Sequence, residues 1–251
     1  MKTRRLFAFT FALLIALSSS AAYAQFEGQV TMNLFSYDNG QPEVSELNLF
    51  ATKDRIMIKG EENMELMGGI SSGGLLIRND MKDFVIMTES DKALQATKAG
   101  IESMVEMMFS WAGESESDSE GPEVEYVFTD RQKTINGYET TEMIVKDAEN
   151  PNKHISVWLT PGIDINWGML AEPWKGMPKS MDKELNGMSQ DVFFKGKNFP
   201  MMIESVEGEE RTKVMEVRNV NRSSIAKAMV EVPAGVQLIS LQEFIFNMMM
   251  E

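Results

Sequence analysis

The sequence predicts a mainly β protein with a few helices, organised around an antiparallel sheet. Short runs that alternate apolar and polar residues recur about every ten residues, with turn-forming residues between them. A hairpin pattern spans Thr134 to Thr160, where two runs rich in β-branched and aromatic residues flank the turn signal Asn150-Pro151-Asn152. Few stretches have a helical period, so strands are expected to dominate.

Residues 1–24 are expected to be a signal peptide that does not belong to the fold. They contain a basic start (Lys2, Arg4, Arg5), an apolar core (Leu6 to Leu17) and the A-x-A cleavage motif Ala22-Tyr23-Ala24. The apolar core is too short to span a bilayer comfortably, although an uncleaved anchor is the alternative. We expect the remaining residues, 25–251, to form a single exported β-rich domain, periplasmic or secreted, with no membrane-spanning segment.

Composition excludes several classes of function. The sequence has no cysteine, which rules out a lipid-anchored lipoprotein, disulfides and thiol chemistry. The net charge is −14, and removal of the three basic residues of the signal peptide would make it −17. Such a surface repels nucleic acid and anionic lipid headgroups, so neither is expected as a partner.

The first half of the chain reads as a meander of strands. In the first run, from Phe26 to Leu34, every second residue is apolar or glycine. Further strands are predicted at 47–51, 55–59, 75–78 and 84–88, with turn signals such as Asp38-Asn39-Gly40 between them.

Residues 92–123 are expected to leave the sheet as a helix followed by a solvated acidic loop. The helix at 99–112 carries an apolar stripe at helical spacing: Ile101, Met104, Val105, Met108 and Trp111. The run from Glu114 to Gly121 is acidic and contains no apolar residue. It lacks the glycine and the ligand spacing of a calcium loop, so a solvated linker is favoured.

The second half of the chain returns to strands. Strands are predicted at 124–128, in the central hairpin, and at 191–195, 199–206 and 212–220, with short helical or irregular segments at 162–170 and 177–185. Met201, Met202 and Ile203 are consecutive apolar residues, as in a sheet that is covered on both faces. A C-terminal helix is predicted at 240–251, because Ser240 and Glu243 form a capping box.

Four short motifs resemble an exported bacterial family of unknown function (domain of unknown function 4412). They are Ile135-Asn-Gly-Tyr138, Val157-Trp-Leu-Thr160, the strand Val214 to Val220, and Val232-Pro-Ala-Gly-Val236, whose last position is aromatic in the family pattern. The resemblance implies a curved antiparallel sheet, a half-barrel similar to LolA-type periplasmic lipoprotein carriers. It also implies helices on the concave face and an apolar cavity for acyl chains. The helix at 99–112 and the Met-rich tail are outside the pattern.

Residue types for catalysis or cofactor binding are scarce. His154 is the only histidine and lies at the hairpin turn, which excludes a Ser-His-Asp triad and a histidine metal cluster. No cofactor or metal is expected. The 22 methionines allow three interpretations: core packing, an adaptable hydrophobic site, or soft-metal binding.

The function predicted from these observations is non-catalytic binding of a hydrophobic ligand, either a lipid or an acylated partner. The ligand would be lined by Ile101, Met104, Met108, Trp111 and Trp158, with the Met-rich helix as a lid. Two alternatives stay open: a protein-interaction or stress-response module of the cell envelope without a small ligand, and a hydrolase that uses carboxylates.

Overall fold

The computed structural model describes residues 25–38, 41–60, 64–66, 70–88, 91–111, 125–147, 150–175 and 184–250. The predicted signal peptide and the predicted acidic loop lie outside these residues. No helix in the described residues is long and apolar enough to cross a membrane.

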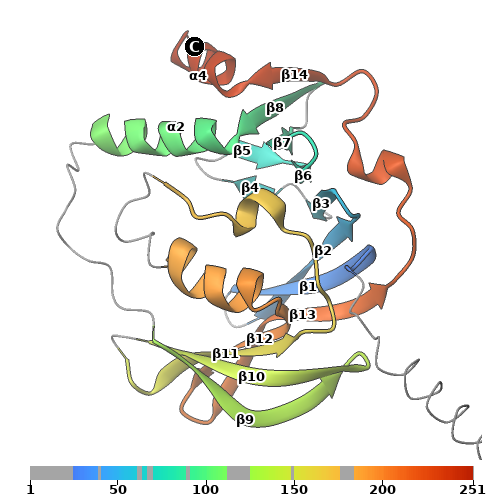
Figure 1. Ribbon diagram of the computed structural model, residues 1–251. Coiled ribbons are helices and arrows are strands. Elements are labelled where there is room, and N and C mark those ends of the chain that lie inside the picture. The colour runs from blue at the N-terminus through green and yellow to red at the C-terminus, as the bar shows by residue number, and fades with distance from the viewer. Residues whose placement is uncertain are drawn as a thin grey trace, which may run out of the picture.

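One twelve-stranded sheet forms the body of the molecule (Figure 1). Its strands are β1 (Gly28–Asp38), β2 (Gln41–Ala51), β3 (Arg55–Gly60), β6 (Gly74–Arg78), β7 (Asp83–Met87), β8 (Lys92–Thr97), β9 (Tyr126–Ile135), β10 (Tyr138–Lys146), β11 (Lys153–Thr160), β12 (Phe199–Glu207), β13 (Glu210–Asn221) and β14 (Gln237–Ser240). Their spatial order is β14-β8-β7-β6-β3-β2-β1-β13-β12-β11-β10-β9. Neighbours are antiparallel except for β14, which runs parallel to β8. Two short strands, β4 (Met64–Leu66) and β5 (Ile70–Ser72), pair separately.

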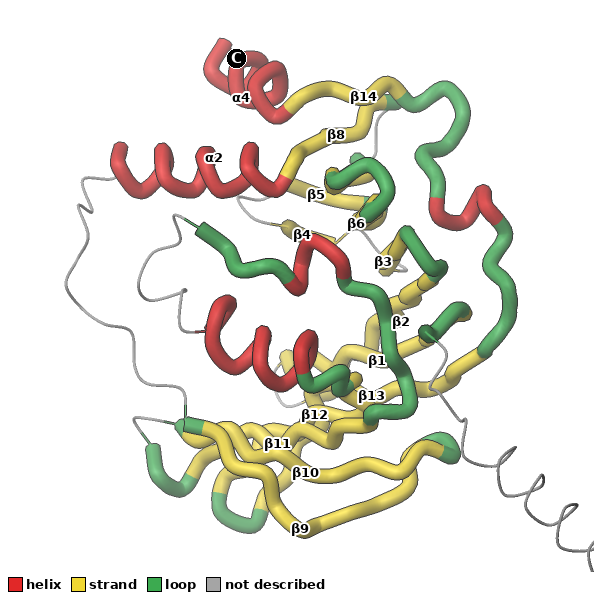
Figure 2. The backbone as a smooth tube through the Cα atoms, viewed as in Figure 1, coloured by secondary structure: helices red, strands yellow, loops and turns green. Residues whose placement is uncertain are grey.

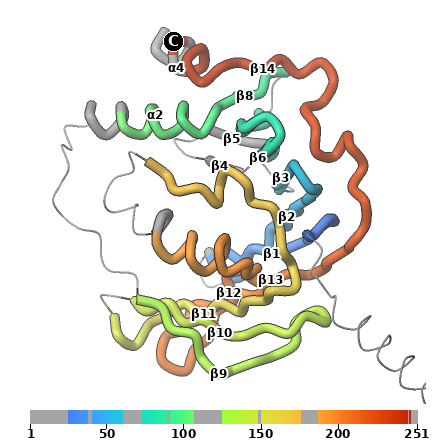
Figure 3. Tube along the Cα trace, in the orientation of Figure 1, coloured from blue at the N-terminus to red at the C-terminus, as the bar shows by residue number. Residues whose placement is uncertain are grey.

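The sheet is open and curved, and helical segments lie in its concave side (Figure 2). The short helix η1 (Gly168–Ala171) and the π-helix η2 (Glu184–Lys195) lie within the curve. Helix α2 (Lys98–Trp111) follows β8, and α4 (Leu241–Met250) follows β14. The helix η3 (Lys227–Val230) belongs to the segment that connects β13 to β14 along the outside of the sheet (Figure 3). The predicted half-barrel is therefore confirmed, including helices on the concave face.

Strand alternation explains why both faces of the sheet are apolar. In β2, Leu49 and Ala51 join the apolar cluster on the concave side, whereas Phe50 joins a second cluster on the outer face. In β3, Ile56 faces the concave side and Met57 the outer face. Successive side chains of a strand point to opposite faces, so consecutive apolar residues are buried only where both faces are covered.

Most of the predicted strands are present, and the hairpin is confirmed as β10 and β11, joined by six ladder pairs from Thr141↔Leu159 to Lys146↔His154. Helix α2 matches the predicted helix within one residue at each end. The N-cap of α4 is also as expected, because the backbone N–H of Glu243 donates to Ser240 Oγ at 3.1 Å.

Two local predictions were wrong, and one strand was missed. Residues 191–195, predicted as a strand from the run Val192-Phe193-Phe194, belong to η2, where Met188 and Val192 are four residues apart and pack together on the sheet. The excursion predicted at 92–123 starts later, since Lys92–Thr97 is strand β8 of the main sheet. Strand β14, which forms the edge beside β8, was not predicted, because four residues carry little periodicity.

Candidate functional site

The concave face of the sheet carries one continuous apolar surface, here called the concave wall. Its buried side chains come from strands between β7 and β12 in the sheet order and include Val30, Leu49, Ile77, Phe84 and Met201. Half-buried apolar side chains extend the same surface: Leu34, Leu47, Ile58, Leu75, Ile135, Tyr138, Ile203 and Val220. The concave wall is therefore apolar across several strands of the sheet.

A segment from Gly162 to Lys175, here called the strap, crosses the concave wall and contains η1. Ile163, Ile165 and Met169 are its buried anchors in the wall. Trp174 stacks on Phe84 with ring centroids 6.2 Å apart. The strap therefore occupies the position that a ligand on this wall would need.

Polar contacts to neighbouring segments hold the strap in place. The Asn79 side chain donates to the Asn166 carbonyl at 3.0 Å and accepts from the Met169 N–H at 3.3 Å. Lys98 Nζ donates to the carbonyls of Glu172 and Pro173 at 2.9 and 2.8 Å. These contacts use main-chain groups of the strap, which water can also satisfy when the strap lifts.

Helix η2 covers the part of the concave face that the central hairpin forms, beside the concave wall. Val192 and Met188 pack with Met143, Val157 and Leu159 of the central hairpin. Gln190 links η2 to the strap, because its Nε2 donates to Leu170 O at 3.2 Å. Gln190 Oε1 is buried and has no hydrogen-bond partner among the described residues, which costs about 1–3 kcal/mol. The strap and η2 together, here called the cover, close the wall but leave this polar group unsatisfied.

The structure brings only part of the predicted ligand-lining set to this wall. Ile101 packs against the concave cluster, and Met104 is half-buried on the same helix. The side chains of Met108 and Trp111 lie outside the part of the chain whose side chains are described. Trp158 lies elsewhere: its neighbours in β11, Val157 and Leu159, face the concave side, so Trp158 faces the outer side.

A polar network on the outer face surrounds Trp158. Its indole Nε1–H donates to Glu204 Oε2 at 3.1 Å, and Lys133 Nζ lies 3.8 Å from the centroid of its ring. Burial lowers the pKa of the Lys133 ammonium, and the attraction of Glu204 and Glu142 offsets this only in part. Trp158 is 6 % exposed, so this network encloses the ring.

Glu142 is the buried carboxylate of this network, with a fully buried side chain. It accepts from Ser156 Oγ at 2.6 Å, from Thr129 Oγ1 at 3.0 Å and from the Arg131 guanidinium. Burial raises the pKa of Glu142, but these hydrogen bonds outweigh it and hold the pKa below its ordinary value. No sequence pattern pointed to this pairing, because the residues lie on three different strands.

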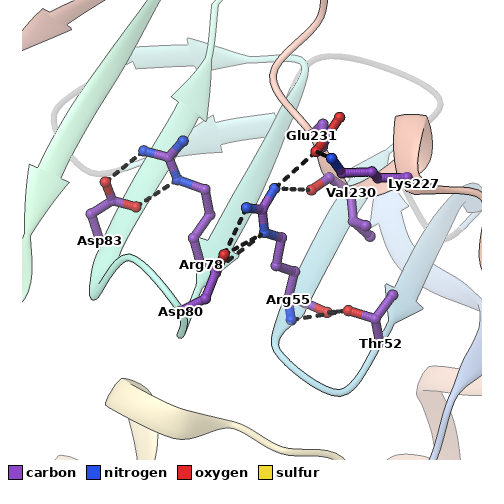
Figure 4. Close-up of polar contacts among 8 residues, drawn as sticks. All are labelled: Thr52, Arg55, Arg78, Asp80, Asp83, Lys227, Val230 and Glu231. Atoms are coloured by element: carbon purple, nitrogen blue, oxygen red, sulfur yellow. Dashed lines mark hydrogen bonds and ion pairs between the residues drawn. The ribbon is translucent and has the colours of Figure 1, made fainter.

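The outer face near β2, β3 and β7 holds a second candidate site. The segment with η3 packs here, and a cavity of about 230 Å³ lies between it and the sheet. Arg55 fastens the segment: it binds Asp80 through two guanidinium nitrogens, at 3.1 and 2.7 Å, and reaches Val230 O and Glu231 Oε1 at 3.4 and 3.5 Å (Figure 4). The hydrogen bonds from Arg55 hold the pKa of Asp80 below its usual range.

The described residues offer little to a metal or to general acid–base chemistry. They contain no group of three or more His, Asp or Glu side chains placed to hold a metal ion. His154 is the second residue of β11 and pairs with Lys146 in the ladder, whereas Glu142 pairs with Trp158 further along the same two strands. The buried pair of Arg78 and Asp83 is mutually satisfied, with two bonds of 2.6 and 2.5 Å.

Comparison with known proteins gives a family but no activity. The family model described as domain of unknown function (DUF4412) matches residues 26–236. No curated protein matches the chain.

Solved structures with similar folds are remote in sequence. PNGF-II in its C2 crystal form is 11% identical with a TM-score of 0.45, and the match covers 88% of this chain but only 32% of PNGF-II. An uncharacterized conserved protein from Thermus thermophilus is 7% identical with a TM-score of 0.42, covering 91% of this chain and 99% of that one. The LolA superfamily protein NE2245 from Nitrosomonas europaea is 8% identical with a TM-score of 0.30, covering 83% and 91%.

Proposed function

The chain belongs to the family of the domain of unknown function DUF4412, and we propose that it binds a hydrophobic ligand, a lipid or an acylated partner, on the concave wall. The observation that carries the proposal is the continuous apolar wall beneath a cover that is separate from the sheet. No catalytic step is part of the proposal.

The cover would act as the lid that the ligand displaces. Only three strap side chains, Ile163, Ile165 and Met169, are fully buried in the concave cluster, whereas the wall supplies most of it. An acyl chain that replaced them would bury the same wall and gain about 0.8 kcal/mol per CH₂ removed from water. The unsatisfied Gln190 Oε1 favours a cover that can move, because opening lets water reach this oxygen.

Native mass spectrometry of the exported protein tests the proposal directly. Protein purified from a lipid-containing host should carry co-purified acyl ligands, and after delipidation it should bind the fluorescent fatty acid cis-parinaric acid. Leu47→Gln adds a polar group to the wall and should weaken binding of the probe. Val214→Gln is the matched control, because Val214 is 39 % exposed and outside the wall. Equal binding by both variants would contradict the proposal.

The absence of cysteine allows the lid to be tested separately. The Lys175 N–H donates to Glu102 Oε1 at 2.9 Å, which places the end of the strap beside α2. The double variant Glu102→Cys, Lys175→Cys, bridged by a short bismaleimide, should keep the strap on α2 and slow uptake of the probe. The unbridged double variant should take it up at the normal rate. A bridged protein that binds the probe as fast as the unbridged one would show that the strap is not the lid.

We further infer that the chain acts after export, from the features of residues 1–24. The expected observation is a processed form that begins at Gln25 in the periplasmic or extracellular fraction. A form that retains Met1 and sediments with membranes would support an uncleaved anchor instead.

A second function, binding of a protein partner without a small ligand, is favoured by strand β9. This strand is the last in the sheet, and Val127 and Phe128 on it are 46 and 49 % exposed. An edge strand with exposed apolar residues can pair with a strand of another protein. Cross-linking from Val127→Cys should then capture a partner, while delipidated and untreated protein would have the same mass.

A further inference from the structure

One amide in the cover, that of Gln190 in η2, is only half satisfied. The side chain is 1 % exposed, and its Nε2 donates to Leu170 O at 3.2 Å and to Glu172 O at 3.4 Å, both in the strap. Its Oε1 has no hydrogen-bond partner, and it is the only buried side-chain nitrogen or oxygen of the described residues in that condition. A buried amide in this state can still accept a hydrogen bond.

The two strap carbonyls fix which way the Gln190 amide points. A carbonyl oxygen can only accept, so the amide nitrogen must face Leu170 and Glu172. The reversed amide would set Oε1 against two acceptors and leave the nitrogen on the unpaired side. The unpaired atom is therefore an acceptor, and only a donor can satisfy it.

The strap residues beside Gln190 already use their main-chain donors. The N–H of Leu170 donates to Trp167 O at 3.1 Å, and the N–H of Glu172 donates to Met169 O at 3.3 Å. Neither N–H can turn to Gln190 Oε1 without breaking the short helix η1. The closed cover therefore keeps this acceptor unpaired.

Leu170 shows how an acyl chain would reach the same amide. Its side chain packs against the concave wall, while its carbonyl accepts from Gln190 Nε2. Helices η1 and η2 lie next to each other within the curve of the sheet, so the amide is at the edge of the wall (Figure 2). An acyl chain with a carbonyl at its head has the same two parts as Leu170, and after lifting the strap it would place them at the same two positions.

The unpaired oxygen distinguishes between head groups that carry a carbonyl. A carbonyl alone takes the place of Leu170 O at Nε2 but leaves Gln190 Oε1 unpaired in the new complex, which is costly in a buried site. A head group that also carries an N–H or O–H can donate to Oε1, so that both sides of the amide are paired. The Gln190 amide therefore selects for a donor.

The surrounding charges do not favour an ionised head group. Among the described side chains at this end of the strap, the two lysines Lys98 and Lys175 are balanced by Glu102 and Glu172. Lys98 Nζ lies 3.7 Å from Glu172 Oε2, and Glu102 Oε1 accepts from the Lys175 N–H. A carboxylate would bring acceptors only, and burying its charge costs more than burying a neutral amide.

We propose that Gln190 binds the head group of the ligand, and that this head group is uncharged and carries both a carbonyl and a hydrogen-bond donor, as in an acyl amide. This inference rests on the proposed binding of an acyl chain to the concave wall, and it adds the position and the chemical class of the head group. Gln190 Nε2 donates to the ligand carbonyl in place of Leu170 O, and the ligand N–H donates to Gln190 Oε1.

Competition of ten-carbon ligands with cis-parinaric acid on the full chain tests the inference. Decanamide and methyl decanoate share the chain and the carbonyl, but only the amide has a donor. An amide is harder to remove from water, so a wall without a polar partner would bind it at least about tenfold more weakly than the ester. With Gln190 as the partner, decanamide should bind at least as tightly as the ester, and more tightly than decanoate at pH 9.

Two results with the wild type would overturn the inference and leave the proposed function intact. One is binding of decanamide about tenfold weaker than binding of the ester, as expected if water or the strap keeps the Gln190 amide occupied. The other is binding of decanoate tighter than binding of decanamide, which would show a charged head group. If neither the ten-carbon ligands nor cis-parinaric acid bind, the proposed function fails as well.

Gln190→Met separates binding of the head group from loosening of the cover. Methionine is close to glutamine in size but lacks the N–H donors and the carbonyl oxygen of the amide. The ratio of decanamide affinity to ester affinity should fall about tenfold, because the hydration of each ligand is the same for both proteins. Asn79→Ala is the matched control: it loosens the strap without touching Gln190, so it should raise both affinities and leave their ratio unchanged. An unchanged ratio in Gln190→Met would overturn the inference.

Discussion

The cover can be loosened at a single residue, Asn79, without touching the concave wall. Asn79→Ala removes both side-chain hydrogen bonds to the strap, to Asn166 O at 3.0 Å and from Met169 N at 3.3 Å. Each such bond contributes about 0.5–1.5 kcal/mol, so the closed cover should lose about 2 kcal/mol. If ligand binds only when the cover is open, the ratio of open to closed molecules, and with it the apparent affinity, should rise about 30-fold.

Stability should change in the opposite direction to affinity. The same loss of about 2 kcal/mol lowers the free energy of unfolding, which for a chain of this size corresponds to a melting temperature about 4–8 °C lower. Thermal unfolding of the delipidated protein and titration with cis-parinaric acid measure the two effects. An ordinary destabilising substitution would lower both stability and affinity. A lower melting temperature together with a higher affinity would therefore indicate a loosened cover.

Asn48→Ala is the matched control for this prediction. The Asn48 side chain accepts hydrogen bonds from Gln29 Nε2 and Thr31 Oγ1, both at 2.8 Å, and both of these donors belong to β1 rather than to the strap. Asn48→Ala should lower the melting temperature without raising the affinity for cis-parinaric acid. If Asn79→Ala loses the expected stability and gains no affinity, the cover does not control access to the wall and the reasoning is refuted.

Three further substitutions test other parts of the structure. Glu142→Gln should lower the free energy of unfolding at pH 7 by about 2–3 kcal/mol, because three hydrogen bonds to a buried carboxylate weaken. The folded pKa of Glu142 lies below its unfolded value, so its contribution is present above the unfolded pKa and is lost as the pH falls through the folded pKa. Urea unfolding at decreasing pH should show the difference from the wild type shrinking, and a constant difference would contradict this. Arg55→Met should speed amide hydrogen exchange in residues 225–236, and unchanged exchange there would show that Arg55 does not fasten the segment. Met201→Ala should cost about 2–5 kcal/mol in the same urea measurement, because Met201 is fully buried in the concave cluster, and a loss below about 1 kcal/mol would contradict tight packing there.

The fold could be predicted from the sequence where a local period carries the information. Strand β1 and the hairpin β10–β11 alternate in period two, and α2 has a helical stripe, so local propensity and tertiary packing agree there. The prediction failed at Val192-Phe193-Phe194, whose β-branched and aromatic residues favour a strand in isolation. Packing of Met188 and Val192 on the hairpin outweighs that preference in the structure.

The candidate sites were harder to predict because they join distant segments. The helical stripe predicted a buried face, and Ile101 of that stripe packs against the concave cluster, whereas its role in lining a ligand stays a prediction. Nothing in the sequence could bring Lys59 and Met229 to one pocket, or show that the strap, at residues 162–175, lies across the wall. For Trp158 the alternation did predict a side opposite Val157 and Leu159. Whether that side of β11 is the concave or the outer face depends on which elements cover the sheet, and alternation alone does not show this.

One strand register accounts for the apolar side chains on both faces of the sheet. In the β2–β3 ladder, Leu49 pairs with Ile58 on the concave wall, and the next pair, Phe50 with Met57, lines the cavity on the outer face. A slip of one residue would exchange the two faces, so the apolar covering on both sides fixes the register from both directions.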